Sequence, residues 1–115
     1  MNRGEIRLVD LEPARGSEAS KRRPAVVVSN PRANIVAVRY GRGVVTVVPV
    51  TSNVARVHPF QTLLPAQDTG LRVDSKAQAE QVRAVDVHRI GPLVGRVPAA
   101  LLTLVDDALR LHLGL

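Results

Sequence analysis

Two side chains that could act together on a phosphate stand at the ends of two valine-rich segments. Arg23 comes directly before Pro24 at the entry to the first segment (21–30), and Thr51 follows the second (44–50). Both segments are rich in β-branched residues, and their valine runs are uninterrupted by charge, which predicts buried strands. If these strands are neighbours, a guanidinium and a hydroxyl meet at one rim of a sheet. Because Arg carries a fixed fork of donors that matches phosphate oxygens, the pair predicts a phosphate-binding site.

Taken one at a time, these two residues also have ordinary interpretations. An Arg before a Pro at a strand entry is often a solvated surface residue, and a Thr after a strand often closes a turn. Single motif matches have high false-positive rates. Their meaning therefore depends on the rest of the chain.

The composition limits the classes of protein to consider. A chain of 115 residues predicts one domain over 1–115, and the absence of cysteine excludes disulfides and thiolate metal sites. The first ten residues carry several charges, which is not typical of a secretory signal. No apolar run approaches the ~20 residues of a membrane span, so we expect a cytoplasmic protein without a membrane segment. The net charge of +6 favours a polyanionic partner, nucleic acid first, although an Arg-rich composition could also reflect a GC-biased genome.

Hydrophobic patterning predicts a mainly β (α+β) fold with five or six short strands and one or two helices, which suggests a small closed barrel. The expected strands are 5–11, 24–29, 44–50, 60–64, 72–76 and 81–85; the expected helices are 31–38, stopped by glycines, and 98–112. Two long polar loops, 12–22 and 51–59, lie between strands. The apolar residues of the C-terminal helix span about 200° of arc, which predicts either deep burial or, our preference, a homodimer contact.

Other motifs for chemistry are absent. The sequence has no glycine-rich nucleotide motif, no HExxH and no GxSxG. His58, His88 and His112 have no spacing typical of a metal site, so we expect neither a metal nor a cofactor.

Several segments in a fixed order resemble the MazF/PemK family of toxin endoribonucleases. They are GEIRLVDLEP (4–13), GSEASKRRPAVVVSN (16–30), PVTS (49–52) and AEQVRAVD (79–86), and the similarity covers nearly the whole chain. The sequence is most similar to actinobacterial MazF-type mRNA interferases. The resemblance implies an SH3-like barrel of five to seven strands, with a short helix after strand two and a C-terminal helix, that forms a homodimer.

The resemblance also implies an activity: metal-independent cleavage of single-stranded RNA by attack of the 2′-hydroxyl on the adjacent phosphate. The products carry a 2′,3′-cyclic phosphate and a 5′-hydroxyl, and the cleavage inhibits translation and growth. A cognate acidic antitoxin would place a disordered segment in the basic groove that binds RNA and would block RNA there.

Matched residue by residue, the active arginine of the family falls on Arg23, its active threonine on Thr51 and its loop glutamate on Glu18. Arg23 would oppose the charge that develops on the phosphate oxygens, and Thr51 would donate to them. Glu18 would either accept the 2′-hydroxyl proton or hold Arg23 in place; the sequence leaves both roles open. Further RNA contacts are predicted as base readers (Asn53, Gln61), phosphate holders (Arg15, Lys21, Arg22, Arg56) and groove residues (Ser52, Gln81).

Two rival functions share the expected fold. A CcdB-type gyrase poison is disfavoured because the chain has no Trp near its C-terminal helix and keeps the arginine and threonine. An SH3-like RNA- or protein-binding module that never cleaves is disfavoured by the retention of Glu18, Arg23 and Thr51 together.

Overall fold

The computed structural model describes residues 1–12, 15–18 and 21–115. Its strands are β1 (Glu5–Asp10), β2 (Arg22–Val27), β3 (Val44–Thr51), β4 (Gln61–Leu64), β5 (Ser75–Gln78), β6 (Arg83–Asp86) and β7 (Ile90–Arg96). The helices are α1 (Pro31–Tyr40), α2 (Ala66–Thr69) and α3 (Ala99–Leu113), and two short 3₁₀ turns, η1 (Ala79–Gln81) and η2 (Val87–Arg89), flank β6.

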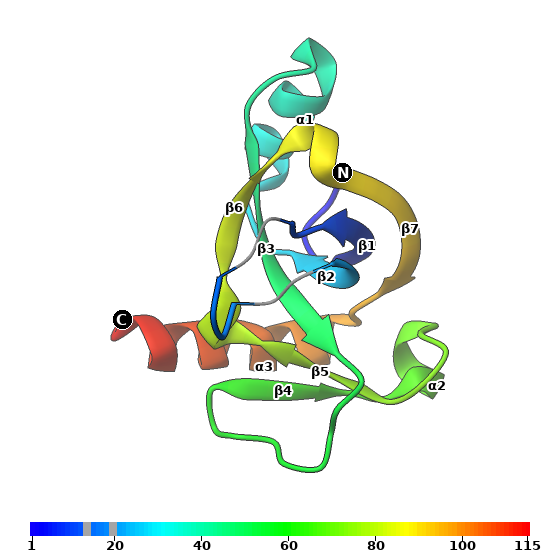
Figure 1. Cartoon of the computed structure of the whole chain (residues 1–115), viewed down its shortest axis with the longest axis vertical. Helices are drawn as coiled ribbons and strands as arrows, with labels where there is room; N and C mark the ends of the chain where they lie inside the picture. Colours follow the sequence, from blue (N-terminus) through cyan, green and yellow to red (C-terminus); the bar gives the residue numbers. More distant parts are fainter. Residues whose placement is uncertain (13–14, 19–20) are drawn as a thin grey trace.

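All seven strands belong to one antiparallel sheet in the order β4-β5-β3-β2-β1-β7, with β6 also paired to β3. The first half of β3 pairs with β6, and its last two residues, Val50 and Thr51, pair with β5. Figure 1 shows β3 running through the molecule from α1 toward α3, while β7 curves around one side. The predicted mainly β class with two principal helices is confirmed. Among the described strands the sheet has two ends, β4 and β7, so closure into a barrel stays a prediction.

Strands β2 and β3 are buried on both faces. Val26 and Val48 pack in one apolar cluster with Val105 of α3. The alternate residues, among them Ala25, Val27, Val45 and Val47, pack in a second cluster on the other face, together with Val9 and Val85. Side chains alternate between the faces of a strand, so burial of both faces requires an unbroken apolar run. This explains why the two valine-rich segments lack the polar alternation of a surface strand.

The ends of the helices follow the predicted signals. The Asn30 side chain accepts a hydrogen bond from the N–H of Arg32, and Gly41 adopts a left-handed conformation where α1 ends, two residues later than expected. Helix α3 buries only Val105 and Ala108, whereas Leu104 and Leu111 are 52% and 59% exposed. Leu101, Leu102 and Leu109 pack against the core, so only part of the apolar arc is exposed in the protomer, and the contact with a second copy stays a prediction. None of the described helices is long and apolar enough to cross a membrane.

Strand β7 is the main element that the sequence did not predict, because its segment contains two glycines and a proline. As an end strand β7 pairs only with β1, so the missing N–H of Pro92 breaks no ladder on its other side. A Cβ on Gly95 would lie 2.5 Å from the carbonyl oxygen of Thr69, so the glycine allows this backbone to approach closely. The predicted strand at 72–76 instead begins at Ser75, because the residues before it form a loop after α2.

A buried carboxylate ties the start of β1 to its surroundings. Glu5 is 5% exposed; its Oε1 accepts from Arg7 Nε and Nη2 at 2.9 and 2.7 Å, and its Oε2 accepts from the N–H of Asn2 at 2.9 Å. Burial alone would raise the pKa of Glu5, but the hydrogen bonds from Asn2 and Arg7 outweigh it and keep the pKa below 4.5.

We predict that Glu5→Gln lowers the free energy of unfolding by about 1–3 kcal/mol at pH 7, because it removes charged hydrogen bonds in a buried position. The folded pKa is depressed, so the stabilisation is present above pH 4.5 and disappears as the pH falls through the folded value. The difference between variant and wild type should therefore shrink toward pH 3. Urea unfolding at pH 7 and pH 3 measures both, with the exposed Asp107→Asn as control. Equal stability of Glu5→Gln and wild type at pH 7 would contradict the assignment.

We also predict that Gly95→Ala destabilises the protein by about 1–3 kcal/mol, because the new methyl group has no room beside the Thr69 carbonyl. Thermal unfolding measures the change, and Val94→Ala in the same strand, at a partly exposed site, is the control. An unchanged melting temperature for Gly95→Ala would show that the two backbones are not held this closely.

Candidate active site

The pairing of β2 with β3 brings the two predicted catalytic residues together. The ladder joins Val27 to Val47, Val26 to Val48 and Ala25 to Pro49. Continued by two residues in the same register, it sets Arg23 opposite Thr51. Residues opposite each other in an antiparallel pair point to the same face, so these two side chains leave the rim on one side.

Both residues line one pocket of about 650 Å³. Ser52 and Asn53 complete its polar edge, immediately after β3. The remaining lining residues come from β1, β2, β3, β5, β7 and the loop between α2 and β5: Leu8, Pro24, Val50, Gly70, Leu71, Arg72, Val73, Ser75 and Val94. The described lining contains two arginines and no acidic residue, so its electrostatics favour an anion.

Thr51 is held by a short series of turns. Its Oγ1 accepts a hydrogen bond from the N–H of Asn53 at 3.2 Å, and Asn53 Oδ1 accepts from the N–H of Ala55 at 3.3 Å. Because the hydroxyl oxygen accepts in this bond, its hydrogen stays available to donate to a ligand. Arg23, half-buried, lies opposite Val9 of β1, in the ladder that joins β1 to β2. Each functional group is thus fixed at the end of a buried strand.

Glu18 lies in the exposed β1–β2 loop and does not line the pocket. Its N–H donates to the carbonyl of Arg15 at 3.1 Å, and the side chain of Gln81 donates to the carbonyl of Ser17 at 2.9 Å. The loop is closed at its base by Lys21, whose N–H donates to Glu12 Oε1. Pro13, Ala14, Ala19 and Ser20 of the predicted polar loop lie outside the described residues.

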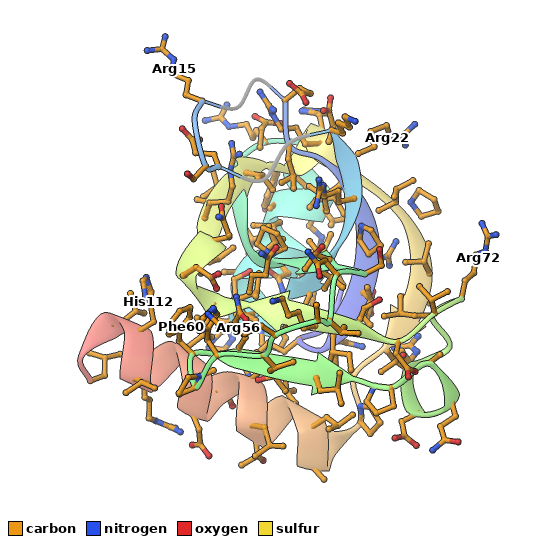
Figure 2. The ribbon with its side chains drawn as sticks, turned by 60° about the horizontal axis from the view of Figure 1, so that its bottom comes forward. Arg15, Arg22, Arg56, Phe60, Arg72 and His112 are labelled. Atoms are coloured by element: carbon orange, nitrogen blue, oxygen red, sulfur yellow. The ribbon has the colours of Figure 1, made fainter. Side chains whose placement is uncertain are left out.

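The other predicted RNA contacts fall into groups. Ser52 and Asn53 line the pocket with Arg23 and Thr51. Arg15 and Arg22 project from the outline of the molecule and Arg56 lies in the β3–β4 loop (Figure 2). Lys21 and Arg22 are exposed beside the strand that carries Arg23, and Gln81 supports the β1–β2 loop. None of Arg15, Lys21, Arg22, Arg56 or Gln81 lines the pocket itself.

Gln61 has a structural position that the sequence did not reveal. It is 9% exposed; its Oε1 accepts from the N–H of His58 at 3.0 Å, and its Nε2 donates to Glu80 Oε2 at 2.7 Å. Both ends of the amide are engaged within the protein, so this conformation gives no support to the prediction that Gln61 reads a base edge.

Arg72 lines the pocket and was not predicted. It lies two residues after Gly70, in the loop between α2 and β5, and its side chain projects from the periphery (Figure 2). The available signal was a basic residue close to a turn glycine. The sequence places that turn about 20 residues beyond Thr51, and only the fold brings the two together.

The sequence and the fold were compared with those of known proteins. Residues 2–113 match the family model described as PemK-like, MazF-like toxin of type II toxin-antitoxin system. Endoribonuclease MazF9 of Mycobacterium tuberculosis is 64% identical over 115 residues, which cover 100% of this chain and 98% of that protein. Endoribonuclease MazF2 of Mycobacterium bovis is 35% identical, with coverage of 100% and 98%.

Solved structures agree with this similarity. MazF from Deinococcus radiodurans superposes with a TM-score of 0.83 at 31% identity, covering 100% of this chain and 97% of that chain. A complex of MazE with MazF from the same organism has a TM-score of 0.75 at 28% identity, covering 100% and 96%. With a family match over nearly its full length and a relative of 64% identity, the chain belongs to the PemK-like, MazF-like toxins of type II toxin–antitoxin systems.

Proposed function

We propose that this toxin is an endoribonuclease that cleaves single-stranded RNA in the pocket between Arg23 and Thr51 by attack of the 2′-hydroxyl, without a metal ion. The observation that carries the proposal is that Arg23 and Thr51, from the paired strands β2 and β3, line one pocket whose described lining has no acidic residue. In this proposal the chain 1–115 is a single toxin domain with an SH3-like barrel, and it acts on RNA in the cytoplasm to inhibit translation and growth.

The chemistry needs charge stabilisation more than it needs a nucleophile from the protein. The 2′-oxygen forms a bond to phosphorus, the bond from phosphorus to the 5′-oxygen breaks, and the products are a 2′,3′-cyclic phosphate and a 5′-hydroxyl. Negative charge grows on the non-bridging oxygens during the attack. Arg23 opposes this charge, and the Thr51 hydroxyl donates to the same oxygens and orients the phosphate.

Proton transfer requires groups other than Arg23, because a guanidinium keeps its proton at any physiological pH. The 2′-hydroxyl must lose a proton and the departing 5′-oxygen must gain one. Glu18 is the candidate acceptor that the sequence supplies, but in this structure it lies in the β1–β2 loop outside the pocket lining. For Glu18 to take the proton, bound RNA has to bring this loop and the pocket together; otherwise Glu18 acts on loop position alone.

RNA would extend from the pocket over the two loops beside it. Ser52, Asn53 and Arg72 contact the nucleotides next to the scissile phosphate, since they line the same cavity. Lys21, Arg22, Arg15 and Arg56 hold neighbouring phosphates.

The partners of the relatives extend the proposal. Two of the solved structures are of MazE bound to MazF from Deinococcus radiodurans and of a mycobacterial endoribonuclease in complex with its cognate antitoxin. We infer that a cognate acidic antitoxin covers the basic pocket of this toxin, and that two copies associate through an apolar surface that includes the exposed leucines of α3.

We predict that Arg23→Ala and Thr51→Ala each lower kcat/KM for RNA cleavage, Arg23→Ala by about 10²–10³-fold, as is typical for loss of one group that stabilises transition-state charge. The assay uses a long unstructured RNA in EDTA, with mapping of the cut sites and of the chemistry of the ends. Arg39→Ala, on the exposed surface of α1, removes the same charge far from the pocket and is the matched control. Tight binding without cleavage by wild type would support a binding module instead, and DNA gyrase would then be tested as the target of a CcdB-type poison.

We predict that Glu18→Gln separates the two roles of that residue. If Glu18 accepts the proton, kcat falls and the acidic limb of the pH–rate profile disappears. If it only positions the loop, KM rises while the shape of the profile stays as in wild type. An unchanged kcat and KM would remove Glu18 from the site.

A further inference from the structure

The loop from Ser52 to Phe60, called the β3–β4 loop, is held by contacts at its start, its middle and its end. At its start, the turns at Thr51 and Asn53 bend the chain away from β3. At its end, the N–H of Gln61 donates to the carbonyl of His58 at 2.9 Å, and the ring of His58 stacks on Phe60 with centroids 5.1 Å apart. The loop carries Ser52, Asn53 and Arg56, which are three of the predicted RNA contacts.

The middle of the loop is held by a buried lysine. Lys76 is 8% exposed, and its Nζ donates to the carbonyl oxygen of Arg56 at 2.5 Å. In the ladder between β3 and β5, Lys76 is the direct partner of Thr51. Lys76 therefore lies beside the predicted catalytic threonine, and its side chain contacts the loop at Arg56, five residues after Thr51. Removing an ammonium from water costs free energy unless strong hydrogen bonds replace the water. Burial of Lys76 therefore carries a desolvation cost, which its hydrogen bond to the loop must offset.

A second buried contact supports the same segment. Gln61 joins the N–H of His58 to the carboxylate of Glu80, in the turn that follows β5. Lys76 and Glu80 thus hold the loop from one short stretch of chain, through the Arg56 carbonyl and through Gln61. Since the carbonyl of Arg56 is drawn inward to Lys76, the orientation of its peptide unit is fixed while its side chain remains exposed.

We propose that Lys76 is a positioning residue for RNA recognition: it keeps the β3–β4 loop in its binding conformation before RNA arrives. This inference rests on the proposed ribonuclease function. A loop that is ordered in advance loses less conformational entropy on binding, so its contacts contribute more of their energy to affinity and to discrimination among sequences. Lys76 is a neighbour of the lining residues Thr51 and Ser75 but does not itself line the pocket. Its ammonium is directed to the Arg56 carbonyl, so its effect is on binding and choice of site, not on the chemical step.

The test is Lys76→Met, which keeps the length and apolar stem of the side chain and removes the donor. We expect KM for a preferred RNA to rise by about tenfold while kcat stays within twofold of wild type, together with cleavage at more sequences along a long RNA. Amide hydrogen exchange, which needs no substrate, should become faster at Ala55 and His58 and stay unchanged in β1 and β2. Lys76→Gln, with a shorter donor, should give intermediate values for both measurements.

The matched control is Arg32→Met, which removes one positive charge from the exposed surface of α1 and leaves the loop contacts intact. It separates loss of loop order from loss of general attraction to RNA. Unchanged exchange in the loop of Lys76→Met, or a fall in kcat at constant KM, would overturn the inference. If wild type itself does not cleave RNA, the proposed function fails, and the exchange data alone then decide whether Lys76 orders the loop.

Discussion

The burial of β2 and β3 on both faces is the constraint on which the rest of the structure depends. Each strand contributes alternate side chains to two apolar clusters, so its buried side chains are apolar. Within the valine run of β3 the polar Thr46 is only half-buried. Arg23 and Thr51 stand near the ends of the buried stretches. A slip of the register would draw one of them into the core and expose valine at the other end, so the packing that stabilises the sheet also sets the guanidinium opposite the hydroxyl.

Strand β3 connects this register to the walls of the site. It pairs with β2 on one side, and on the other it pairs first with β6 and then with β5. Strand β3 pairs with β6 as far as Val47 and with β5 from Val50. The loop that leads into β5, with Leu71 and Arg72, lines the pocket. The pairing of β3 with β5 also places Lys76 beside Thr51, so one cross-strand pair joins the reactive end of the sheet to the support of the β3–β4 loop.

Elements with a strong local signal could be predicted from the sequence, and elements that depend on tertiary contacts could not. A few neighbouring residues are enough to predict the two valine-rich strands, the cap at Asn30 and the helix ends at the glycines after α1 and α3. Strand β7 resembles a turn in sequence, because it contains Pro92 and Gly95. Only the structure shows that Gly95 makes room for the Thr69 carbonyl and that Pro92 lies in a strand at the end of the sheet.

The site shows the same division. Arg23 and Thr51 were predicted to meet if their two strands are neighbours, and Ser52 and Asn53 were predicted as RNA contacts in the loop that follows Thr51. Arg72 reaches the pocket through a loop whose path no local pattern indicates. Gln61 resembles a surface amide until the positions of His58 and Glu80 are known. Burial and tertiary contacts decide such cases, and periodicity carries no information about them.

The pairing of β1 with β7 has a consequence for the order in which the site is assembled. Glu5 pairs with Arg96, so this edge of β1 is covered only by a strand far along the chain. Contacts between such distant parts of the chain form slowly, because a long loop must close first. Val94 of β7 lines the pocket together with residues of β2 and β3, so this wall of the pocket is missing until β7 pairs with β1.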